Sequence, residues 1–502
     1  MNSLSGIGLQ IIEWGALLFI FVLGCLLLLL VSLYIIDKTQ TSQTVRRNFP
    51  VVGRFRYLFE HYGEFFRQYF FAMDREEMPF NRAERSWVYR AAKNVDSTVA
   101  FGSTRNLSPT GEILFVNCPF PTLSEDIAPT GNVAIGELYC ETPYITSSIF
   151  NISGMSYGAL SKPAVLALSK GAAKAGCWMN TGEGGCSPHH LEGGADLVVQ
   201  IGTAKYGVRN EQGELCDHRL KELAAYPQVK MFEIKMSQGA KPGKGGILPG
   251  EKVSAEIAEI RGISVGQDSI SPNGHPDIRN EGDLLDMISH IRKVTGKPVG
   301  FKTVVGAEHF FETLFDEINR RGVSAAPDFI TIDSADGGTG AAPQSLMDYM
   351  GLPIRESLPW VVDKLNECNL RQRIKVIASG KMITPSGVAW AMSMGADFVV
   401  SARGFMFALG CIQALQCNKN TCPTGITTHN KKLQRGLVPK DKATRVADYA
   451  KNMNYEVGII AHACGVKEPR ELKRHHARVV SEDNGRSIPL SEKFPESNNH
   501  AV

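Results

Sequence analysis

The chain has 502 residues, of which 43% are hydrophobic, so it can bury a large core and form more than one domain. Lys and Arg total 54 against 51 for Asp and Glu, and the net charge is only +3. This balance argues against a nucleic-acid partner, because proteins that bind nucleic acids concentrate positive charge. The eleven cysteines show no disulfide-type spacing, which indicates a reducing compartment.

An uncharged apolar segment at residues 15–36 follows a short tail of 14 residues. Its 22 residues are long enough to cross a hydrocarbon core about 30 Å thick as a helix. A buried helix or a signal peptide fits less well, because the run is long and no basic residue precedes it. Only Glu13 carries charge before the segment, and five basic residues follow it before residue 57. The positive-inside rule therefore predicts a single-pass membrane protein whose residues after the segment face the cytoplasm.

Residues 37–110 form a basic and aromatic region after the predicted membrane span. Aromatic side chains recur at mixed helical spacing between residues 57 and 71. Such a pattern is compatible with an amphipathic helix at the membrane surface, but we favour a helix that packs on the main domain.

Residues 111–440 change to short apolar runs that alternate with helix-length segments, and residues 441–502 are expected to form a helical segment and a polar tail. The alternation predicts parallel strands with crossover helices, and a count near eight favours a closed (β/α)8 TIM-type barrel over an open sheet. The eight candidate strands are residues 145–153, 176–180, 229–236, 268–272, 298–304, 328–334, 374–379 and 397–402.

Glycine-rich loops follow seven of these runs, at the strand ends where barrel enzymes place their chemistry. Tight turns explain any one loop equally well, but seven together favour an anionic ligand bound by backbone N–H groups. Gly380 and Gly404 follow the last two strands, where such barrels hold phosphate, and Lys302 adds a cation in the fifth. Flavin mononucleotide (FMN) fits best, because three cysteines suited to an iron-sulfur cluster begin seven residues after Gly404. A flavin can convert the single electrons of such a cluster into a hydride. The glycines do not form a dinucleotide fingerprint, so we expect no nicotinamide site.

The loop after the third run is cationic and contains Gln238 and Lys241, with Lys235 just before it. These side chains are suited to hold a carboxylate-bearing substrate, although a solvated basic loop is the alternative. Glu183 lies among glycines and is suited to steer a cationic or amine reactant. The nearby His189 and His190 are expected to be surface residues.

Three cysteines, Cys411, Cys417 and Cys422, are separated by five and then four residues, and Pro423 follows the last. This spacing indicates an iron-sulfur cluster, and three ligands favour the 3Fe-4S type, with a distant fourth ligand left open. A zinc site is the weaker alternative, because His429 is the only nearby fourth ligand.

Six motifs in order resemble the synthase domain of glutamate synthases: MSYGALSK, NTGEGG, QGAKPGKGGxLPG, SPNGHPDI, DGGTGA and Cx5Cx4CPTG. The resemblance covers roughly residues 145–430. It implies an FMN barrel with a three-iron cluster that reduces the imine of 2-oxoglutarate and ammonia to L-glutamate. It also implies a one-electron donor such as ferredoxin, which would pass electrons to the cluster.

By this resemblance, three groups of residues receive roles. The flavin would be lined by Met155, Ser156, Thr181, Lys302, Gly337, Gly338, Gly380 and Gly404. The oxo acid and the ammonia entrance would face Lys235, Gln238, Lys241 and Glu183, and the cluster would be held by Cys411, Cys417 and Cys422.

The chain also departs from complete glutamate synthases. It starts Met1-Asn2 where they carry a glutaminase domain with an N-terminal cysteine nucleophile, so we expect it to use external ammonia or a separate ammonia-supplying partner. It thus looks like the stand-alone, membrane-anchored relatives of the synthase domain. Two alternatives stay open: an amino-acid or hydroxy-acid dehydrogenase that passes electrons to quinone, and a non-catalytic electron-transfer protein.

Overall fold

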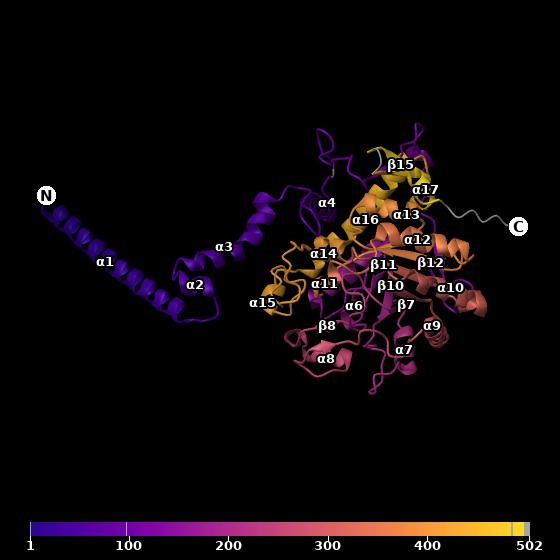
Figure 1. Ribbon diagram of the computed structural model, residues 1–502, viewed down its shortest axis with the longest axis horizontal. Coiled ribbons are helices and arrows are strands. Elements are labelled where there is room, and N and C mark those ends of the chain that lie inside the picture. The colour runs from indigo at the N-terminus through magenta and orange to yellow at the C-terminus, as the bar shows by residue number, and fades with distance from the viewer. Residues whose placement is uncertain (1, 97, 483–484, 496–502) are drawn as a thin grey trace. The chain divides into compact units, whose positions relative to one another are not determined.

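The computed structural model describes residues 2–96, 98–482 and 485–495. These residues divide into two compact units, Met1–Ala83 and Glu84–Val502 (Figure 1). The first unit contains α1 (Asn2–Thr39), α2 (Thr44–Asn48), α3 (Gly53–Phe66) and the π-helix η1 (Arg67–Phe71).

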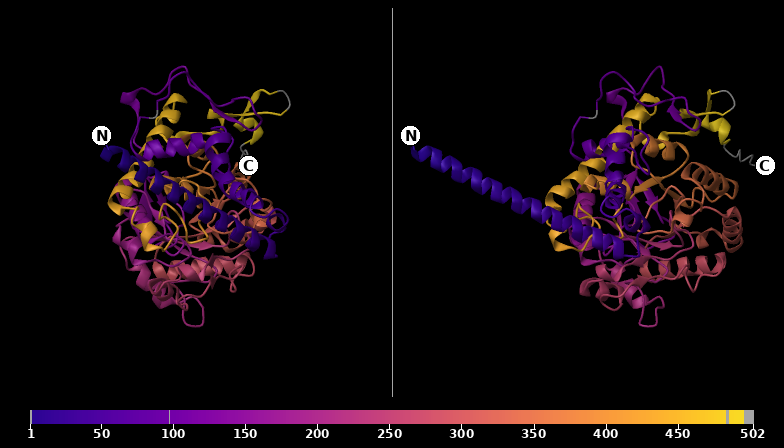
Figure 2. Two further views of the ribbon diagram at one scale, coloured as in Figure 1. Left: turned by 90° about the vertical axis from the view of Figure 1, so that its left-hand side faces the viewer. Right: turned by 60° about the vertical axis from the view of Figure 1, so that its left-hand side comes forward.

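Helix α1 is one uninterrupted rod in each view (Figure 2). Its segment Gly8–Thr39 is the one helix of the described residues that is long and apolar enough to cross a membrane, judged by length and composition. The most apolar part of this segment is not buried against the rest of the protein.

Eight parallel strands of the second unit form a closed barrel, as the sequence predicts. Each strand pairs with the next along the chain, and β13 pairs with β4 to close the ring. The barrel strands are β4 (Phe150–Ile152), β5 (Met179–Asn180), β6 (Leu197–Ile201), β7 (Val229–Lys235), β10 (Val299–Val304), β11 (Phe329–Asp333), β12 (Lys375–Ser379) and β13 (Phe398–Ser401).

One predicted barrel strand is wrong. Residues 268–272 contain β9 (Ser269–Ile270), which pairs antiparallel with β8 (Ile247–Leu248) outside the barrel. The missing member is β6, whose five residues are all buried. Since β6 is a short apolar run without alternation, its periodicity does not distinguish it from a buried helical segment.

The predicted strand 145–153 is two strands. Its first part, β3 (Tyr144–Thr146), pairs antiparallel with β2 (Val133–Ile135), and only β4 enters the barrel. Ile135 and Tyr144 of this hairpin belong to the apolar cluster inside the barrel. The hairpin therefore contributes to the apolar end of the barrel interior.

Side chains that point into the barrel change from apolar to polar or charged along β7 and β11. In β7, Met231 belongs to the apolar cluster, whereas Glu233 lines a polar cavity and Lys235 follows two residues later. In β11, Phe329 likewise belongs to the apolar cluster, and Thr331 lines the cavity beside Glu233. Because alternate residues of a strand face the same side, the charged groups gather at the carboxyl ends of the strands.

Helices cover the outside of the strands, and local sequence signals set their ends (Figures 1 and 2). The side chain of Ser161 accepts a hydrogen bond from the N–H of Ala164 at the start of α5, and Gly176 ends α5 with a left-handed φ of 72°. The main helices of this unit are α5 (Lys162–Ala175), α7 (Asp217–Ala224), α8 (Ala255–Arg261), α9 (Glu281–Thr295), α10 (Glu308–Arg321), α12 (Ile354–Glu367), α13 (Pro385–Ser393), α14 (Arg403–Leu409) and α16 (Pro439–Ala463). Shorter elements are α6 (Pro188–Glu192), α11 (Gln344–Met347), α15 (Lys431–Gln434), α17 (Leu490–Lys493), β1 (Ile113–Phe115), β14 (Ala477–Val480) and β15 (Ser487–Pro489), whereas α4 (Arg82–Ala92) spans the unit boundary.

Helix α16 packs along α5, so the C-terminal segment belongs to the barrel unit. The two helices approach each other at Gly171. A Cβ atom placed on Gly171 would lie 2.4 Å from Cγ1 of Val446 and 2.8 Å from the carbonyl oxygen of Ala443. Only glycine fits this contact without a shift of the neighbouring helix.

We expect Gly171→Ala to lower the free energy of unfolding by about 1–3 kcal/mol, because overpacking forces tightly packed atoms apart. Thermal unfolding followed by circular dichroism measures this change. Gly306→Ala is the matched control, since a Cβ at Gly306 would meet nothing within 4 Å. Equal melting temperatures for the two variants would contradict the close approach of α5 and α16.

Candidate functional site

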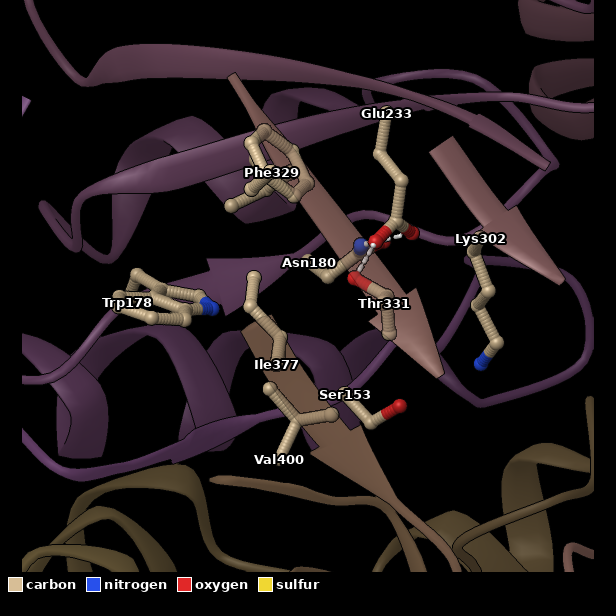
Figure 3. A pocket seen from close by; sticks show the side chains of 10 residues that line it. Ser153, Trp178, Asn180, Glu233, Lys302, Phe329, Thr331, Ile377 and Val400 are labelled. Carbon is tan, nitrogen blue, oxygen red and sulfur yellow. Dashed lines mark hydrogen bonds between the residues drawn. The ribbon is translucent and has the colours of Figure 1, made fainter. Parts of the chain in front are cut away.

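A polar cavity lies inside the barrel (Figure 3). The buried carboxylate of Glu233 accepts hydrogen bonds from Asn180 Nδ2 at 2.8 Å, Gln200 Nε2 at 2.7 Å and Thr331 Oγ1 at 2.6 Å. The cavity volume is about 10 Å³, which leaves room for about one water molecule. Each of the three partners is a neutral donor, so this network holds Glu233 in place without cancelling its charge.

Lys302 lines the same cavity and forms an ion pair with Asp333, with 3.0 Å between Nζ and Oδ2. The carboxylate of Asp333 also accepts hydrogen bonds from the N–H groups of Gly239 and Ser334, each at 3.1 Å. Both charged side chains are at most 9% exposed. The ion pair therefore lies in a region where unpaired charges would be costly.

The pKa values of this pair reflect a balance between burial and charge. Burial alone would lower the pKa of Lys302, but the carboxylates of Asp333 and Glu233 outweigh it and raise this pKa above its ordinary value. Burial alone would raise the pKa of Asp333, but Lys302 and the N–H of Gly239 hold it below its ordinary value. Lys302 is thus a fixed cation inside the barrel at neutral pH.

The four side chains predicted to face the substrate form one cluster. Lys235 Nζ donates a hydrogen bond to Glu183 Oε1 at 2.7 Å and another to Gln238 Oε1. The buried Lys241 is close enough to Glu183 and Lys235 for their charges to affect its pKa, which burial lowers. The structure brings these predicted residues together, and their chemical roles stay predictions.

Glu183 is ionised at neutral pH in this cluster. Burial opposes its charge, but Lys235, Lys241 and the buried Arg261 outweigh burial and hold the pKa of Glu183 below its ordinary value. The sequence analysis did not single out Arg261. Its guanidinium donates to the carbonyl oxygen of Tyr157, and its position depends on how α8 packs below the loops.

Two glycines leave room for the Glu183 side chain. A Cβ on Gly202 would lie 2.6 Å from Cβ of Glu183, and one on Gly246 would lie 2.8 Å from its Oε1. Real Cβ atoms do not approach other atoms this closely, so a side chain at Gly202 would displace Glu183 itself, and one at Gly246 would displace its carboxylate. The loops after β6 and β7 therefore close around the carboxylate that the loop after β5 supplies.

Three glycines predicted to line a flavin make close contacts between loops. Gly380 has a φ of 141°, and a Cβ there would lie 2.2 Å from Ser334 Oγ. A Cβ on Gly337 would lie 2.8 Å from Cα of Gly239. A Cβ on Gly338 would lie 2.8 Å from the guanidinium carbon of Arg403. These contacts explain the glycines by packing, so their flavin role stays a prediction.

Gly404 packs on a different part of the protein. Its N–H donates to Ser401 Oγ at 3.3 Å, and a Cβ there would lie 2.3 Å from the hydroxyl oxygen of Tyr449 in α16. Its neighbour Arg403 donates from Nη2 to the carbonyl oxygen of Asp336 at 2.5 Å. Burial lowers the pKa of Arg403 to about 10, so it stays a cation, and it is a candidate phosphate ligand at the end of the last barrel strand.

The other predicted flavin residues, Met155, Ser156 and Thr181, also lie at the strand ends. The carbonyl oxygen of Met155 lies 3.3 Å from His190 Nε2, and Thr181 Oγ1 accepts a hydrogen bond from the N–H of Gln200 at 3.1 Å. The backbone nitrogen of Ser156 would lie 2.6 Å from a Cβ on Gly182. The loops after β4 and β5 are therefore in direct contact.

The prediction that His189 and His190 are surface residues is wrong. Both are buried, and burial lowers the pKa of His190 to about 4. His190 Nδ1 lies 2.8 Å from Ser187 Oγ, and His189 Nε2 lies 2.7 Å from Glu256 Oε1. Ser187 is a local partner at the start of α6, whereas Glu256 comes from α8, 67 residues further along the chain, where the local sequence does not reveal it.

The three cysteines of the predicted cluster lie close enough to affect one another's pKa. Burial raises the pKa of Cys411 to about 12, and the charges of Cys417 and Cys422 add to the rise. Burial would also raise the pKa of Cys422, but hydrogen bonds from threonine side chains outweigh it and lower this pKa. Within residues 2–96, 98–482 and 485–495, however, no group of three His, Cys, Asp or Glu is arranged to hold a metal ion.

Lys252 connects the cysteine loop to the loop after β7. Its buried Nζ donates to the carbonyl oxygens of Cys417 at 2.7 Å and of Thr427 at 2.6 Å. Burial lowers the pKa of Lys252, and the nearby Cys417 and Cys422 oppose this shift. The amine opposes the rise that burial causes in the pKa of Cys417, but burial outweighs it and this pKa stays above its ordinary value.

A closed parallel barrel that gathers charged side chains and glycine-rich loops at the carboxyl ends of its strands is typical of α/β-barrel enzymes. Residues 123–467 match the family model described as the conserved region in glutamate synthase. The chain therefore belongs to the glutamate synthase family, as the six motifs predict.

Three relatives show the range of similarity. The glutamate synthase large subunit-like protein YerD of Bacillus subtilis is 38% identical over 504 residues, which cover 92% of this chain and 95% of the relative. The archaeal glutamate synthase [NADPH] of Methanocaldococcus jannaschii is 36% identical, over 68% of this chain and 62% of its own length. The archaeal-type enzyme of Thermotoga neapolitana is 34% identical, over 68% and 64%. This chain thus spans less than two thirds of the two NADPH enzymes.

Solved structures are more distant. A mandelate oxidase variant is 12% identical with a TM-score of 0.44, over 79% of this chain and 98% of that one. A flavocytochrome b2 variant is 15% identical with a TM-score of 0.44, over 78% and 82%. At these TM-scores the two structures do not indicate a cofactor or a substrate for this chain.

The ion pair predicts a pH-dependent loss of stability. Without Lys302, burial would raise the pKa of Asp333, so ionising this carboxyl at higher pH would oppose folding. We expect Lys302→Met to cost about 3–5 kcal/mol at neutral pH, because it leaves a buried charge unpaired. The difference in melting temperature from the parent protein should widen as pH rises from about 5 to 8.

Lys170→Met is the control, because Lys170 pairs with Glu192 on the surface, where both side chains are at least 40% exposed. Its melting temperature should follow that of the parent protein at every pH. A gap for Lys302→Met that does not change with pH would contradict the role of Asp333.

Proposed function

We propose that the chain is a flavin-dependent oxidoreductase of the glutamate synthase type, which converts 2-oxoglutarate and external ammonia to L-glutamate. Ammonia and the keto group would condense to 2-iminoglutarate and water. A hydride and a proton would then reduce the imine. The observation that carries this proposal is the cluster of Lys235, Lys241, Gln238 and Glu183 at the strand ends.

The charges of this cluster suit the two reactants. Lys235 and Lys241 are cations that attract the carboxylates of a dicarboxylic oxo acid, and Gln238 can donate a further hydrogen bond. Glu183 is ionised, so it can attract ammonium and accept the proton that ammonium must lose before it attacks the keto carbon. Ammonium would therefore bind at Glu183, and the carboxylates of the oxo acid would bind at the surrounding Lys235 and Lys241.

The strand ends also suit FMN. Lys302 is a buried cation, and the partly buried cation Arg403 has its guanidinium carbon 2.8 Å from where a Cβ on Gly338 would lie. The glycines keep side chains away from these loops, so the backbone N–H groups and the two cations are suited to hold an anionic cofactor. When bound, FMN would supply hydride transfer and conversion between one-electron and two-electron steps.

Cys411, Cys417 and Cys422 would hold a 3Fe-4S cluster. Their spacing in the sequence and the hydrogen bond from the buried Lys252 to the carbonyl oxygen of Cys417, which fixes this loop, support the assignment. The cluster would accept electrons one at a time from a donor such as ferredoxin. Ammonia would come from solution or from a separate partner.

We also propose that α1 crosses a membrane once and that the barrel unit lies in the cytoplasm. The length of Gly8–Thr39 and the positive charge that follows it support this topology. Since a synthase with soluble reactants needs no membrane, α1 favours a second candidate function. That candidate is a membrane-linked dehydrogenase of amino or hydroxy acids that passes electrons to quinone.

Reoxidation of the reduced flavin tests the proposed reaction. We expect anaerobically reduced protein to be reoxidised by 2-oxoglutarate with ammonium but by neither alone, as measured by flavin absorbance. Lys235→Ala should slow this step about 100-fold or more, because it removes a preorganised cation from the reacting centre. Lys244→Ala is the control, since Lys244 is an exposed lysine of the same loop.

The same assay separates the two candidate functions. If oxidised flavin is instead reduced by an amino or hydroxy acid without any added reductant, the dehydrogenase is correct and the synthase is wrong. Equal rates for Lys235→Ala and the parent protein would contradict the assignment of this cluster.

The metal content tests the cysteine assignment independently of turnover. We expect Cys417→Ser to lose most of its iron, measured by elemental analysis, together with the electron paramagnetic resonance signal of an oxidised 3Fe-4S cluster. Cys368→Ser, a cysteine outside this loop, should keep both. Zinc in the parent protein in place of iron would contradict the proposed cluster.

A further inference from the structure

A buried carboxylate fixes the turn that follows the apolar helix. The side chain of Asp37, near the end of α1, is fully buried in spite of its charge. It accepts hydrogen bonds from Arg46 in α2 at 2.6 and 2.9 Å, from Arg54 in α3 at 2.7 Å twice, and from the N–H of Val51 at 3.0 Å. Charge-assisted pairs with two guanidinium groups give this turn a defined geometry. The start of α3 is therefore held at the end of α1.

Helix α3 carries an apolar stripe on one face. Its stripe residues recur at intervals that return to the same side of a helix, i, i+3, i+4, i+7 and i+11. They are Phe55, Leu58, Phe59, Tyr62 and Phe66, and each is between 44% and 66% exposed. Arg56 and Glu60 lie on the other face.

The exposed stripe continues into η1. Tyr69 is 49% exposed and Phe70 is 75% exposed. Soluble surfaces rarely expose an apolar patch of this extent unless it binds something. The stripe therefore needs an occupant that covers a long, narrow, aromatic surface.

The charge and position of the segment identify this occupant as a lipid bilayer. Residues 37–71 contain six Lys and Arg against three Asp and Glu, which suits the anionic headgroups of a cytoplasmic leaflet. Tyrosine and other aromatic side chains are favoured at the level of the headgroups. The Asp37 turn also starts α3 where the apolar segment Gly8–Thr39 ends.

We propose that residues 44–71 form an interfacial anchor, in which the stripe Phe55, Leu58, Phe59, Tyr62 and Phe66 inserts at the boundary between headgroups and acyl chains. The inference rests on the proposed membrane crossing of α1. It replaces our expectation that the aromatic region packs on the main domain. The basic face would point to the aqueous side and attract anionic lipid.

Photo-crosslinking of the full chain tests this anchor. The chain is reconstituted in vesicles of phosphatidylcholine and phosphatidylglycerol with Phe59→p-benzoylphenylalanine or, as the matched control, Glu60→p-benzoylphenylalanine. The two positions are neighbours on opposite faces of α3. After irradiation, mass spectrometry identifies what is attached to each residue. We expect a lipid adduct several-fold more abundant at position 59 than at position 60.

Other outcomes would overturn the inference. A crosslink from position 59 to residues 84–502 would show that the stripe packs on the barrel unit, and a crosslinked dimer would show that it binds a second copy. Equal lipid adducts at both positions, or none at either, would also contradict an inserted stripe.

Alkaline carbonate extraction of the same vesicles distinguishes this inference from the proposed crossing. Release of the chain at high pH would show that α1 does not span the bilayer, so the proposed topology and the anchor would both fail. Retention without a preference for position 59 would overturn only the interfacial anchor.

Discussion

Buried charges inside the closed barrel have to be paired, because alternate residues of each strand face an interior that excludes water. Glu233 receives three neutral hydrogen bonds, and Lys302 pairs with Asp333. The two groups are coupled, since Glu233 helps to keep Lys302 charged. This polar layer supports the strand ends, where Lys235 and Glu183 form a second pair. Charged side chains are therefore found at the carboxyl ends of the strands, where they have partners, and the apolar cluster at the other end offers none.

Close approach of loops is the second constraint on the site. Gly202 and Gly246 make room for Glu183, and Gly239 and Gly337 let the loops after β7 and β11 touch. These contacts place cations from different strands around one carboxylate and leave backbone groups accessible. The glycines therefore serve the site first by packing, and their suitability for an anionic cofactor follows from the same lack of side chains.

Buried charges also fix the geometry of the cysteine loop and of the N-terminal unit. Lys252 joins the loop of the proposed substrate site to the cysteine loop, so the two share one buried support. In the N-terminal unit, Asp37 joins three helices in the same manner, with two arginines around one carboxylate. Lys252 and Asp37 are each a single buried charge that holds together segments separated in the sequence.

The sequence by itself determined the closed parallel barrel and pointed to Glu183, Lys235, Gln238 and Lys241, because strand-helix alternation and glycine-rich loops are local patterns. Tertiary structure alone decided that β6, rather than residues 268–272, completes the ring. It also decided that His189 and His190 are buried and that Gly404 faces Tyr449. Strand pairing and helix packing join residues far apart in the chain, and local periodicity carries no information about such partners.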